Sequence, residues 1–567
     1  MEAISKGKSD LILASVLRME RFLKQMDSKI NGPGQFSTCR PPNGGIGEIG
    51  EVASPMGPYS MTSGGGGLRG NLEFPLHNWL HNVQNASISR LHTSTAESIL
   101  EWPHFDAYAA LRPRTSVSIF NLEQARTPLG ASWQLPMLPF ASASDIDSII
   151  QTFQQNINFW YPTMAISVLD PLREKISTGD LGNDCDSCLA LLLMALGCAC
   201  QSTASALDHD GEVARPNLPP ERKMMGDMYF NCVMNRMHVA YQEVSRSALQ
   251  CLLFTAFYYA FSQRPLQAWS FVNMAATKCR VLLSYEPIGA TSDDRECIRR
   301  VFWSCFILES DYLAELSALP LSGISDMESS VPLPAQCHTH ANTIDEERSA
   351  LYFLACLSIR RLLNRVHHLL YSKDTGASLD DHRFPNMVAE LDHQLEEWRE
   401  LLPPAFQFTL DTSPSPNQQA GFLRQRYLTC RSVIYRPYLM WMLAAPRWVD
   451  QSVCELCKKC LDACIEHILN LRSFLHTVFV DTWICSLSMA AAMLILLAGY
   501  RVPGVKAHIR PEATILGQHL KSLLTRWITI TGESPSPSVQ QAIQWIEIAD
   551  ELIRNEAGRS DIGRREC

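Results

Sequence analysis

The stretch DDRECIRRVFWSCFILESDYLAELSA, residues 293–318, predicts one long helix and indicates how the rest of the chain folds. Phe302, Trp303 and Phe306 supply large apolar surfaces, which a helix buries against its neighbours. Acidic and basic residues, among them Arg299 and Arg300, are spaced along the same stretch and can pair with each other. A helix of this composition requires other helices to cover its apolar side.

Helical periodicity continues on both sides of this stretch, from about residue 95 to about residue 556, without convincing strand alternation. Polar, Pro-rich breaks separate the helices, and no fixed repeat is present. We therefore predict an all-α fold, a large domain of stacked antiparallel helices with its core at 145–500. The helices are expected near 145–158, 185–202, 225–262, 265–284, 293–318, 346–372, 386–401, 419–444, 449–476, 482–500, 511–530 and 538–556.

The N-terminal part of the chain has a different character. Residues 1–30 are predicted to form a helix with heptad spacing, which either dimerises as a short coiled coil or packs on its own domain. Residues 31–94 are predicted to be a flexible linker, because 31–70 contain twelve Gly and five Pro. Residues 557–567 are predicted to form a disordered tail. The seam of the heptad helix consists of Ile12, Val16, Met19, Leu23, Met26 and Ile30.

Composition limits the possible functions. The chain has 567 residues and a formal net charge of −9, which argues against coating nucleic acid through bulk charge. Its 19 cysteines stand mostly in apolar runs, and the N-terminus lacks a secretory leader, so we expect free thiols in a reducing compartment. The uncharged run 483–500 could just span a membrane, but a buried helix is the better interpretation, and no membrane partner is expected.

Cys454, Cys457, Cys460 and Cys464 have the spacing of an iron–sulfur motif, but the context is wrong. Ile465 stands where that motif has Pro, and on a helix the two ends of the run lie about 15 Å apart. We therefore predict that these cysteines belong to a helix core and bind no metal. His367 and His368 are adjacent and point in different directions, so a metal site is not expected there either.

No catalytic motif is complete. The acidic fragments 293–297 and 183–187 lack residues of the magnesium-binding motifs of isoprenoid synthases and occur in reverse order. Phosphate loops, dinucleotide fingerprints and nucleophile elbows are missing. The sequence therefore predicts a protein that is not an enzyme and has no catalytic or cofactor-binding residues.

Several phrases together resemble the fungal-specific transcription factor regulatory domain, also called the middle homology region. The strongest phrase is 293–334, in which an Arg-Arg-x-Phe-Trp helix runs into a Leu-rich turn and ends on Val-Pro-Leu-Pro. Supporting phrases are ESILEWPHF (97–105), NFWYPTM (158–164), LQCLLFTAFYYAFSQRPLQAW (249–269), LDHQLEEWRELLP (391–403) and LRQRYLTCRSVIYRPYL (423–439). The residues that carry the resemblance are Trp102, Trp160, Cys251, Trp269, Arg299, Arg300, Phe302, Trp303, Pro320, Pro332, Pro334, Trp398, Arg436 and Pro437.

We interpret these residues as structural rather than ligand-binding. Arg436-Pro437 is expected to end a helix, because proline biases the preceding residue away from the α conformation. The two arginines of the helix are expected to pair with acidic residues nearby. These partners would be Asp293, Asp294 or Glu309.

The resemblance implies a nuclear regulator of RNA polymerase II transcription that controls a metabolic or biosynthetic gene set. Family members usually begin with a zinc-binding cluster of six cysteines, whereas only Cys39 precedes Cys185 here. We therefore expect no zinc cofactor in this sequence and either a longer gene product or contact with promoter DNA through a DNA-binding partner. A dimer and a small-molecule effector are further expectations. The alternative is a helical module that binds a metabolite or a partner without direct DNA contact.

Overall fold

The computed structural model describes residues 88–565 except 90, 112–117, 128, 130–137, 207–219, 286–288, 317–318, 336–343, 374–375, 377–381, 412, 445–450, 473–478 and 531–534. These described residues belong to one compact unit. They form helices without a named strand, and a single isolated bridge joins His92 to Ser372. The all-α prediction is confirmed, whereas the heptad helix 1–30 and most of the linker 31–94 lie outside the described residues.

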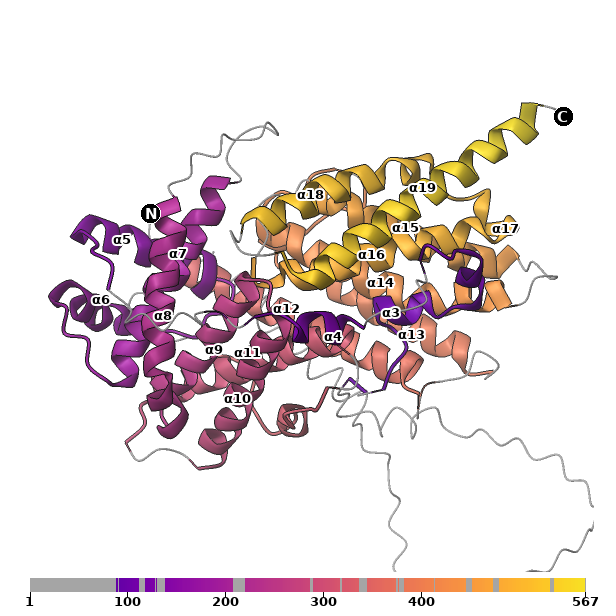
Figure 1. Cartoon of the computed structure of the whole chain (residues 1–567). Helices are drawn as coiled ribbons and strands as arrows, with labels where there is room; N and C mark the ends of the chain where they lie inside the picture. The colour runs from indigo at the N-terminus through magenta and orange to yellow at the C-terminus, as the bar shows by residue number, and fades with distance from the viewer. Residues whose placement is uncertain are drawn as a thin grey trace, which may run out of the picture. The chain divides into compact units, whose positions relative to one another are not determined.

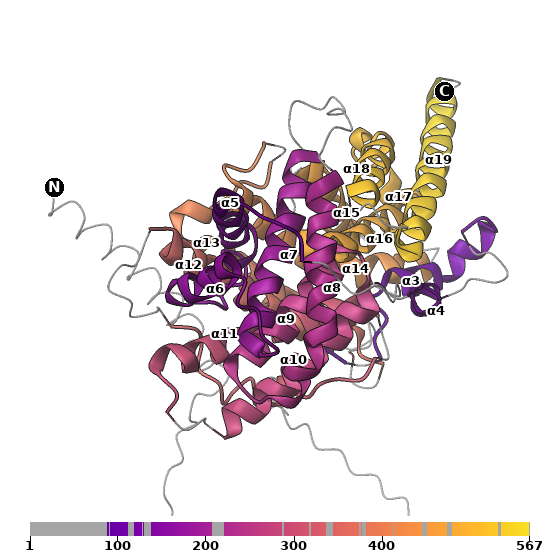
Figure 2. The ribbon, with the colours of Figure 1, turned by 60° about the vertical axis from the view of Figure 1, so that its left-hand side comes forward.

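The helices of the first half pack mainly with one another. Figures 1 and 2 both show α7 beside α8, with α9, α10 and α11 below them. The helix α7 is apolar on all sides and is buried almost throughout, which is the usual environment of such a helix. In chain order these helices are α3 (Ala96–Leu100), α4 (Ile119–Gln124), α5 (Ala143–Phe153), α6 (Leu169–Thr178), α7 (Cys185–Ala206), α8 (Pro220–Gln242), α9 (Arg246–Phe261), α10 (Pro265–Ser284) and α11 (Ser292–Glu315).

The second half forms a neighbouring group, drawn in orange and yellow in Figure 1. In this group α14 packs on α15, and α16 packs on α19. The short helices α3 and α4, from the beginning of the described chain, contact α16 and α19 respectively. The group consists of α12 (Ile344–Tyr371), α13 (Phe384–Glu400), α14 (Gln418–Ala444), α15 (Gln451–Arg472), α16 (Thr482–Tyr500), α17 (Pro503–Lys506), α18 (Leu516–Ile530) and α19 (Pro537–Arg565).

Local sequence determines where the helix α11 begins. The Thr291 side chain accepts a hydrogen bond from the backbone of Asp294, and the Asp294 carboxylate accepts one from the backbone of Thr291. This reciprocal capping box satisfies amide groups that the first turn of a helix leaves without partners. It fixes the start of the helix on which Trp303 and Asp311 lie.

Buried polar contacts connect the two ends of the described chain. The Glu123 carboxylate of α4 is almost completely buried and accepts hydrogen bonds from the Ser536 and Ser538 hydroxyls, both at 2.5 Å. Ser538 in turn accepts the indole N–H of Trp483 at 2.8 Å. Charged acceptors make stronger hydrogen bonds than neutral ones, so this cluster holds α4, α16 and α19 together.

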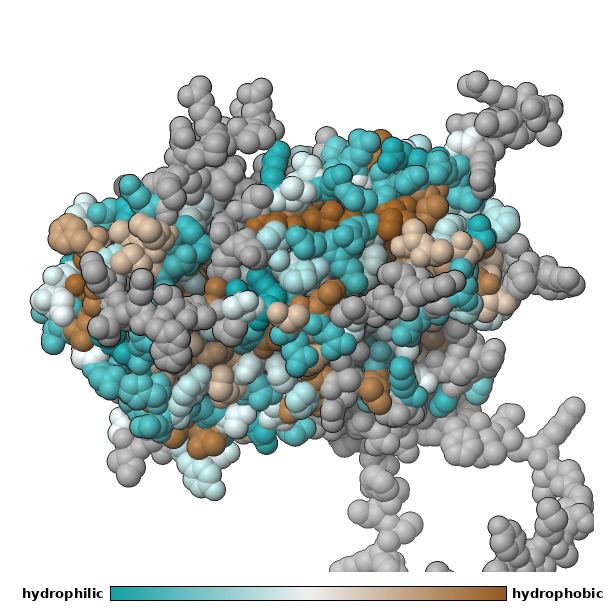
Figure 3. Space-filling model, in the orientation of Figure 1, coloured by the Kyte–Doolittle hydropathy of each residue, from teal (hydrophilic) through white to brown (hydrophobic). Residues whose placement is uncertain are grey.

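In the part of the chain that the structure describes, two helices are long and apolar enough to cross a membrane, Cys185–Thr203 within α7 and Thr482–Tyr500, which is α16. Most residues of both helices are buried inside the protein. Figure 3 shows hydrophilic side chains over most of one face, interrupted by a hydrophobic band where α18 and α19 lie. The apolar surfaces of α7 and α16 are therefore used for packing in this structure.

Several predicted boundaries differ from the structure. The predicted helix 225–262 is two helices, α8 and α9, because Ser245 caps a new helix at Arg246. Packing begins before residue 95, since Ile88 and His92 are buried. At the other end, α19 continues to Arg565, so the predicted tail is helical almost to its end.

The prediction that Pro437 ends a helix is wrong, because α14 continues past it to Ala444. Proline has no N–H, so the carbonyl of Val433, four residues earlier, loses its usual helical partner. The hydroxyl of Tyr371, from α12, donates a hydrogen bond to that carbonyl at 2.6 Å. A neighbouring helix thus supplies the missing donor, and the proline is tolerated.

This arrangement predicts a measurable coupling between Tyr371 and Pro437. Tyr371→Phe leaves the Val433 carbonyl buried without a donor, which lowers the free energy of unfolding by about 1–3 kcal/mol. In a Pro437→Ala background the restored backbone N–H can take that role, so the same substitution costs less than about 1 kcal/mol. Denaturant unfolding of the four proteins measures the difference.

The matched control is Tyr285→Phe, because the Tyr285 side chain is 78% exposed. This substitution should change the free energy of unfolding by less than about 0.5 kcal/mol. An equal effect of Tyr371→Phe in both backgrounds would contradict the proposed exchange of donors.

Candidate functional site: a buried charged cavity

A cavity of about 110 Å³ lies inside the domain, among α11, α12, α14, α15 and α16. Its walls carry an unusual number of buried charged side chains, whereas most buried positions elsewhere are apolar. Buried charges require partners or a ligand, so this cavity is the candidate functional site. The charged and titratable residues in its wall are Asp311, Glu315, Arg360, His367, Arg426, Arg436, His467, Asp481 and Cys485.

The centre of the site is a carboxylate shared by two arginines. The Asp311 Oδ1 atom of α11 lies 2.6 Å from Arg360 Nη1 of α12, and Oδ2 lies 3.0 Å from Arg426 Nη2 of α14. Burial raises the pKa of Asp311, but the two guanidinium groups more than offset this effect and hold the pKa below its usual range. Asp311 is therefore a firmly ionised carboxylate that connects three helices.

The arginines keep donors that nothing in the described chain occupies. Arg360 Nε donates to Asn364 Oδ1 at 2.9 Å, but its Nη2 atom is buried without a partner. Arg426 Nε is also buried without a partner, while its guanidinium carbon lies 5.2 Å from the centre of the Phe422 ring. Unpaired buried donors are rare in proteins, and each of them favours an acceptor nearby.

The opposite situation occurs at Asp481, directly before α16. This side chain is 4% exposed, and both carboxylate oxygens are buried without a hydrogen-bond partner among the described residues. Burial raises the pKa of Asp481 to about 7, although Arg426 acts in the other direction. Asp481 thus offers two unused acceptors at the wall that it shares with Arg426.

The third arginine, Arg436, lies on the side of the segment that precedes α3. Its Nη1 atom donates to the Ser94 carbonyl at 2.8 Å, and its Nε atom is buried without a partner. Glu315 accepts the backbone N–H of Ala96 at 3.1 Å, and burial raises the pKa of Glu315 to about 7. The same segment therefore closes one side of the cavity and holds a second perturbed carboxyl group.

Two histidines close this side further. The Ser94 hydroxyl lies 2.7 Å from His92 Nδ1 and 2.8 Å from His367 Nδ1, and His92 Nε2 donates to the Leu313 carbonyl at 2.8 Å. Burial lowers the pKa of both imidazoles. They are therefore neutral at physiological pH. They neither balance the negative charge of the carboxylates nor add to the positive charge of the arginines.

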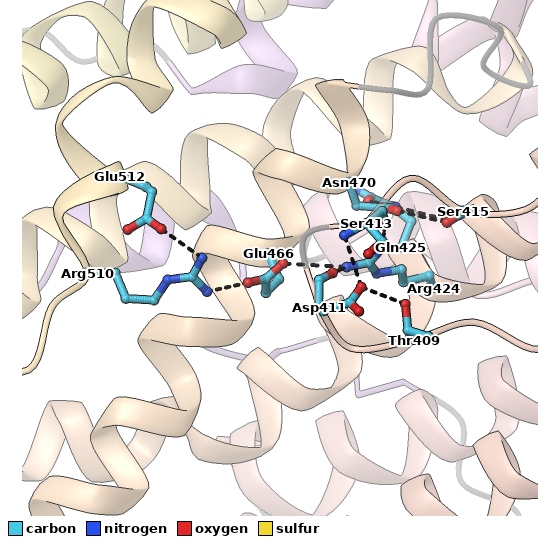
Figure 4. Close-up of polar contacts among 11 residues, drawn as sticks. Thr409, Asp411, Ser413, Ser415, Arg424, Gln425, Glu466, Asn470, Arg510 and Glu512 are labelled. Atoms are coloured by element: carbon cyan, nitrogen blue, oxygen red, sulfur yellow. Dashed lines mark hydrogen bonds and ion pairs between the residues drawn. The ribbon is translucent and has the colours of Figure 1, made fainter.

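A polar network beside the cavity joins α14 and α15 (Figure 4). Asn470 donates to Gln425 Oε1 at 2.7 Å, and Gln425 lies 3.3 Å from His467 at the cavity wall. Figure 4 also shows Glu466 between Arg424 and Arg510, which joins α14 to the segment after α17. This network fixes the helix faces that carry Arg426 and His467.

A larger cavity of about 420 Å³ lies between the end of α5 and the beginning of α12. A π-helical turn, Gln154–Asn158, forms part of its wall. Its charged residues are half-buried or exposed, and Asp345 is 82% exposed in its side chain. Such groups are solvated by water and need no ligand. The smaller, charged cavity is therefore the candidate functional site.

Most of the residues that we selected from the sequence lie in the packing of the domain. Phe302 and Trp303 are buried in α11, and the Trp303 indole N–H donates to the Pro332 carbonyl at 2.9 Å. Trp398 is buried and donates to the Ser358 hydroxyl at 2.9 Å. Trp102 and Cys251 are also buried, Trp269 and Pro334 are half-buried, and Pro320 is exposed.

The prediction that Arg299 and Arg300 pair with Asp293, Asp294 or Glu309 is wrong. Both arginines pair with Glu296, at 2.6 and 2.9 Å. Asp294 instead pairs with Arg246, and Glu309 accepts the backbone N–H of Ser322. Glu296 is three and four residues before the arginines, so it is a closer helical neighbour than the residues that we proposed.

Of the selected residues, Arg436 lines the charged cavity, and Trp160 lies beside it. Trp160 packs edge-to-face on Tyr352 with ring centres 4.8 Å apart, and it lines a small void together with Arg426 and Asp481. Sequence reasoning missed Asp311, Arg360, Arg426 and Asp481. The available signal was a charged residue at a position where the helical pattern requires an apolar one.

Within the described residues, no group of three or more His, Cys, Asp or Glu side chains is arranged to hold a metal ion. Cys454, Cys457, Cys460 and Cys464 are buried along α15, and burial raises the pKa of the Cys457 thiol above its usual value. This part of the chain therefore does not fit a zinc cluster. Cys39 lies outside the described residues.

The unpaired carboxyl group of Asp481 predicts a pH dependence. The folded protein holds its proton up to about pH 7, whereas the unfolded chain releases it near pH 4. In Asp481→Asn this stability penalty disappears, so the wild-type protein loses stability relative to the variant as pH rises from about 4 to 7. The slope is at most about 1.4 kcal/mol per pH unit and levels off above pH 7. Thermal unfolding at several pH values measures it.

Asp311→Asn is the matched control, because the Asp311 pKa is shifted in the opposite direction. Its carboxylate stabilises the fold above pH 4 and loses this effect as pH falls through the lowered pKa. The substitution should therefore destabilise the protein at pH 7, by about 3–5 kcal/mol, because two arginines lose their buried partner. Parallel pH profiles for wild type and Asp481→Asn would refute the assignment of an unpaired Asp481.

Part of the chain is similar to known proteins. Residues 150–400 match the family described as fungal specific transcription factor domain. The chain is 23% identical over 392 residues to the Aspergillus rugulosus protein named transcription factor ecdB, a match that covers 65% of this chain and 66% of that protein. It is 22% identical over 313 residues to cutinase transcription factor 1 beta of Fusarium vanettenii, covering 46% of this chain and 35% of the relative.

A transcriptional regulatory protein of Schizosaccharomyces pombe is 26% identical over 204 residues, which is 34% of this chain and 24% of the relative. The chain thus spans between about a quarter and two thirds of the length of these relatives. No solved structure matches the chain. The matched residues 150–400 run from the end of α5 to the end of α13 and include Asp311 and Arg360. Residues 150–400 of this chain are therefore similar to the fungal specific transcription factor domain.

Proposed function

We propose that this protein is a fungal regulator of RNA polymerase II transcription that acts in the nucleus on a metabolic or biosynthetic gene set. The match of residues 150–400 to the transcription factor domain carries the proposal, together with three relatives that are named as transcription factors or regulators. The charged cavity takes Asp311 and Arg360 from the matched residues, and it is a place where a regulatory signal could act. Catalysis and a resident cofactor are not part of this proposal.

Promoter contact has two possible routes. Either the gene product includes a zinc-binding cluster upstream of this sequence, or the chain reaches DNA through a DNA-binding partner. The second route uses the heptad helix that the sequence predicts over 1–30. The local charge, seven basic against four acidic residues over 1–40, suits pairing better than base reading. Sequencing the 5′ end of the transcript distinguishes the two routes, since six upstream cysteine codons at cluster spacing would remove the second.

Chromatin occupancy tests the regulatory function. An epitope-tagged chain expressed in its own cell should be enriched reproducibly at a set of promoters, because a transcription regulator acts at such sites directly or through a partner. Immunoprecipitation followed by sequencing measures the enrichment, and an untagged strain is the control. A well-expressed protein without enrichment at any promoter would reject the function and favour a metabolite-binding or partner-binding module.

A dimer through residues 1–30 makes a second prediction. Val16→Glu together with Leu23→Glu places charges in the apolar seam, which should convert a dimer of the full chain into a monomer. Light scattering measures the mass, and Lys24→Glu, outside the seam, should leave the dimer intact. If the double variant remains a dimer, the seam does not join the subunits, and the helix packs on its own domain.

A further inference from the structure

The charged cavity has buried donors and buried acceptors in its wall that lack hydrogen-bond partners among the described residues. Nitrogen atoms of Arg360, Arg426 and Arg436 are buried without acceptors, and both carboxylate oxygens of Asp481 are buried without donors. Arg360, Arg436 and Asp481 are at most 4% exposed. Leaving such groups unsatisfied costs about 1–3 kcal/mol each, so a molecule with both an acceptor and a donor fits the site.

The balance of charge identifies the acceptor. Three guanidinium groups face the firmly ionised carboxylate of Asp311 and the Glu315 carboxyl, whose pKa burial raises to about 7, while the histidines of the wall are neutral. Planar guanidinium groups bind carboxylates through paired N–H donors, and a metal cation would be repelled. Phosphate would match the arginines, but near pH 7 it carries up to two negative charges close to Asp481, whereas a carboxylate carries one. A carboxylate is therefore the better acceptor.

Asp481 identifies the second group of the ligand. An ammonium or a hydroxyl group donates hydrogen bonds to a carboxylate, whereas a methyl group would leave both oxygens unpaired. Because Asp481 and Arg426 share one wall, the donor must be close to the ligand's carboxylate. This geometry suits an amino or hydroxyl group on the carbon next to the carboxylate.

The cavity volume limits the size of the ligand. An apolar cavity of about 150 Å³ holds one benzene molecule, so a cavity of about 110 Å³ holds a molecule of at most about six non-hydrogen atoms. Neighbouring aromatic rings prevent easy extension, since Phe422 and Tyr352 close the void beyond Asp481. Long side chains are therefore excluded.

We propose that the charged cavity is a binding site for a small α-amino or α-hydroxy acid, whose carboxylate is held by the arginines and whose donor group contacts Asp481. The ligand connects α11, α12 and α14 with the start of α16, and it stabilises the arrangement of these helices that the structure shows. A ligand that binds one arrangement more tightly shifts the population toward it, and such a ligand can act as an effector. Only the word effector rests on the proposed regulatory function; the binding site does not.

Binding to the purified full chain tests the proposal, with thermal unfolding and calorimetry as readouts. The probes are L-alanine, L-lactate and propionate, which have similar size and differ in the ammonium, hydroxyl or hydrogen next to the carboxylate. We expect saturable binding of L-alanine or L-lactate at least tenfold tighter than that of propionate. A preference for L-alanine identifies an amino acid site, and a preference for L-lactate identifies a hydroxy acid site.

Variants assign the contacts. Asp481→Asn should weaken binding of the preferred acid at least tenfold and leave propionate within twofold, since propionate has no donor for Asp481. Arg436→Gln should weaken all three acids, because it removes a donor to the carboxylate. Asp345→Asn, an exposed position of the other cavity, should change nothing. Asp481→Asn also removes a buried carboxyl group whose ionisation destabilises the fold, so loss of folding is not expected to obscure its result.

Three results would overturn the proposal: no saturable binding of L-alanine or L-lactate at 10 mM (about the range of abundant metabolites), equal binding of propionate, or tighter binding of inorganic phosphate. These results are independent of chromatin occupancy. Selective binding without promoter enrichment would retain the site and reject the regulatory function. Promoter enrichment without binding would retain the function and reject the site.

Discussion

The ion pairs of Asp311 with Arg360 and Arg426 are the constraint on which the packing around the cavity depends. They join α11, α12 and α14 at a point where Asp311 and Arg360 are buried and the Arg426 side chain is 14% exposed. Buried ion pairs add little net stability, because removing charges from water offsets their attraction. Their effect is selective: any packing that separates Asp311 from its arginines leaves an unpaired buried charge. The helices are therefore held in one relative arrangement.

This arrangement has a consequence for the cavity itself. Apolar walls can move together and remove an empty space, but walls with like charges cannot do so without a counter-ion. Arg360, Arg426 and Arg436 carry more positive charge than Asp311 neutralises, and Asp481 is ready to change its protonation state. The cavity is thus a direct result of placing charged residues on helix faces that otherwise pack with apolar residues.

The sequence predicted the helical class and most of the helices, because apolar periodicity is a local signal. It failed where a distant residue decides the outcome. Pro437 looks like a helix end until Tyr371, from another helix, supplies the missing donor. Ser94 and Arg436 are far apart in the chain and meet only in the fold. The cavity depends on such long-range meetings, so its residues were not found as a group, although Asp311 and Glu315 interrupt the apolar pattern of α11 visibly.

The phrases that resemble the family and the residues of the cavity have different roles on shared helices. In α11, Trp303 is fixed by the Pro332 carbonyl, and Asp311 lies two turns further along the same helix. In α14, Arg436 directly precedes the tolerated Pro437 and lines the same cavity as Arg426. Aromatic packing determines where these helices lie, and the charges determine what the space between them can hold. A change in that space is transmitted to rigid, well-packed helices, which is the physical requirement for a ligand to alter the arrangement of a domain.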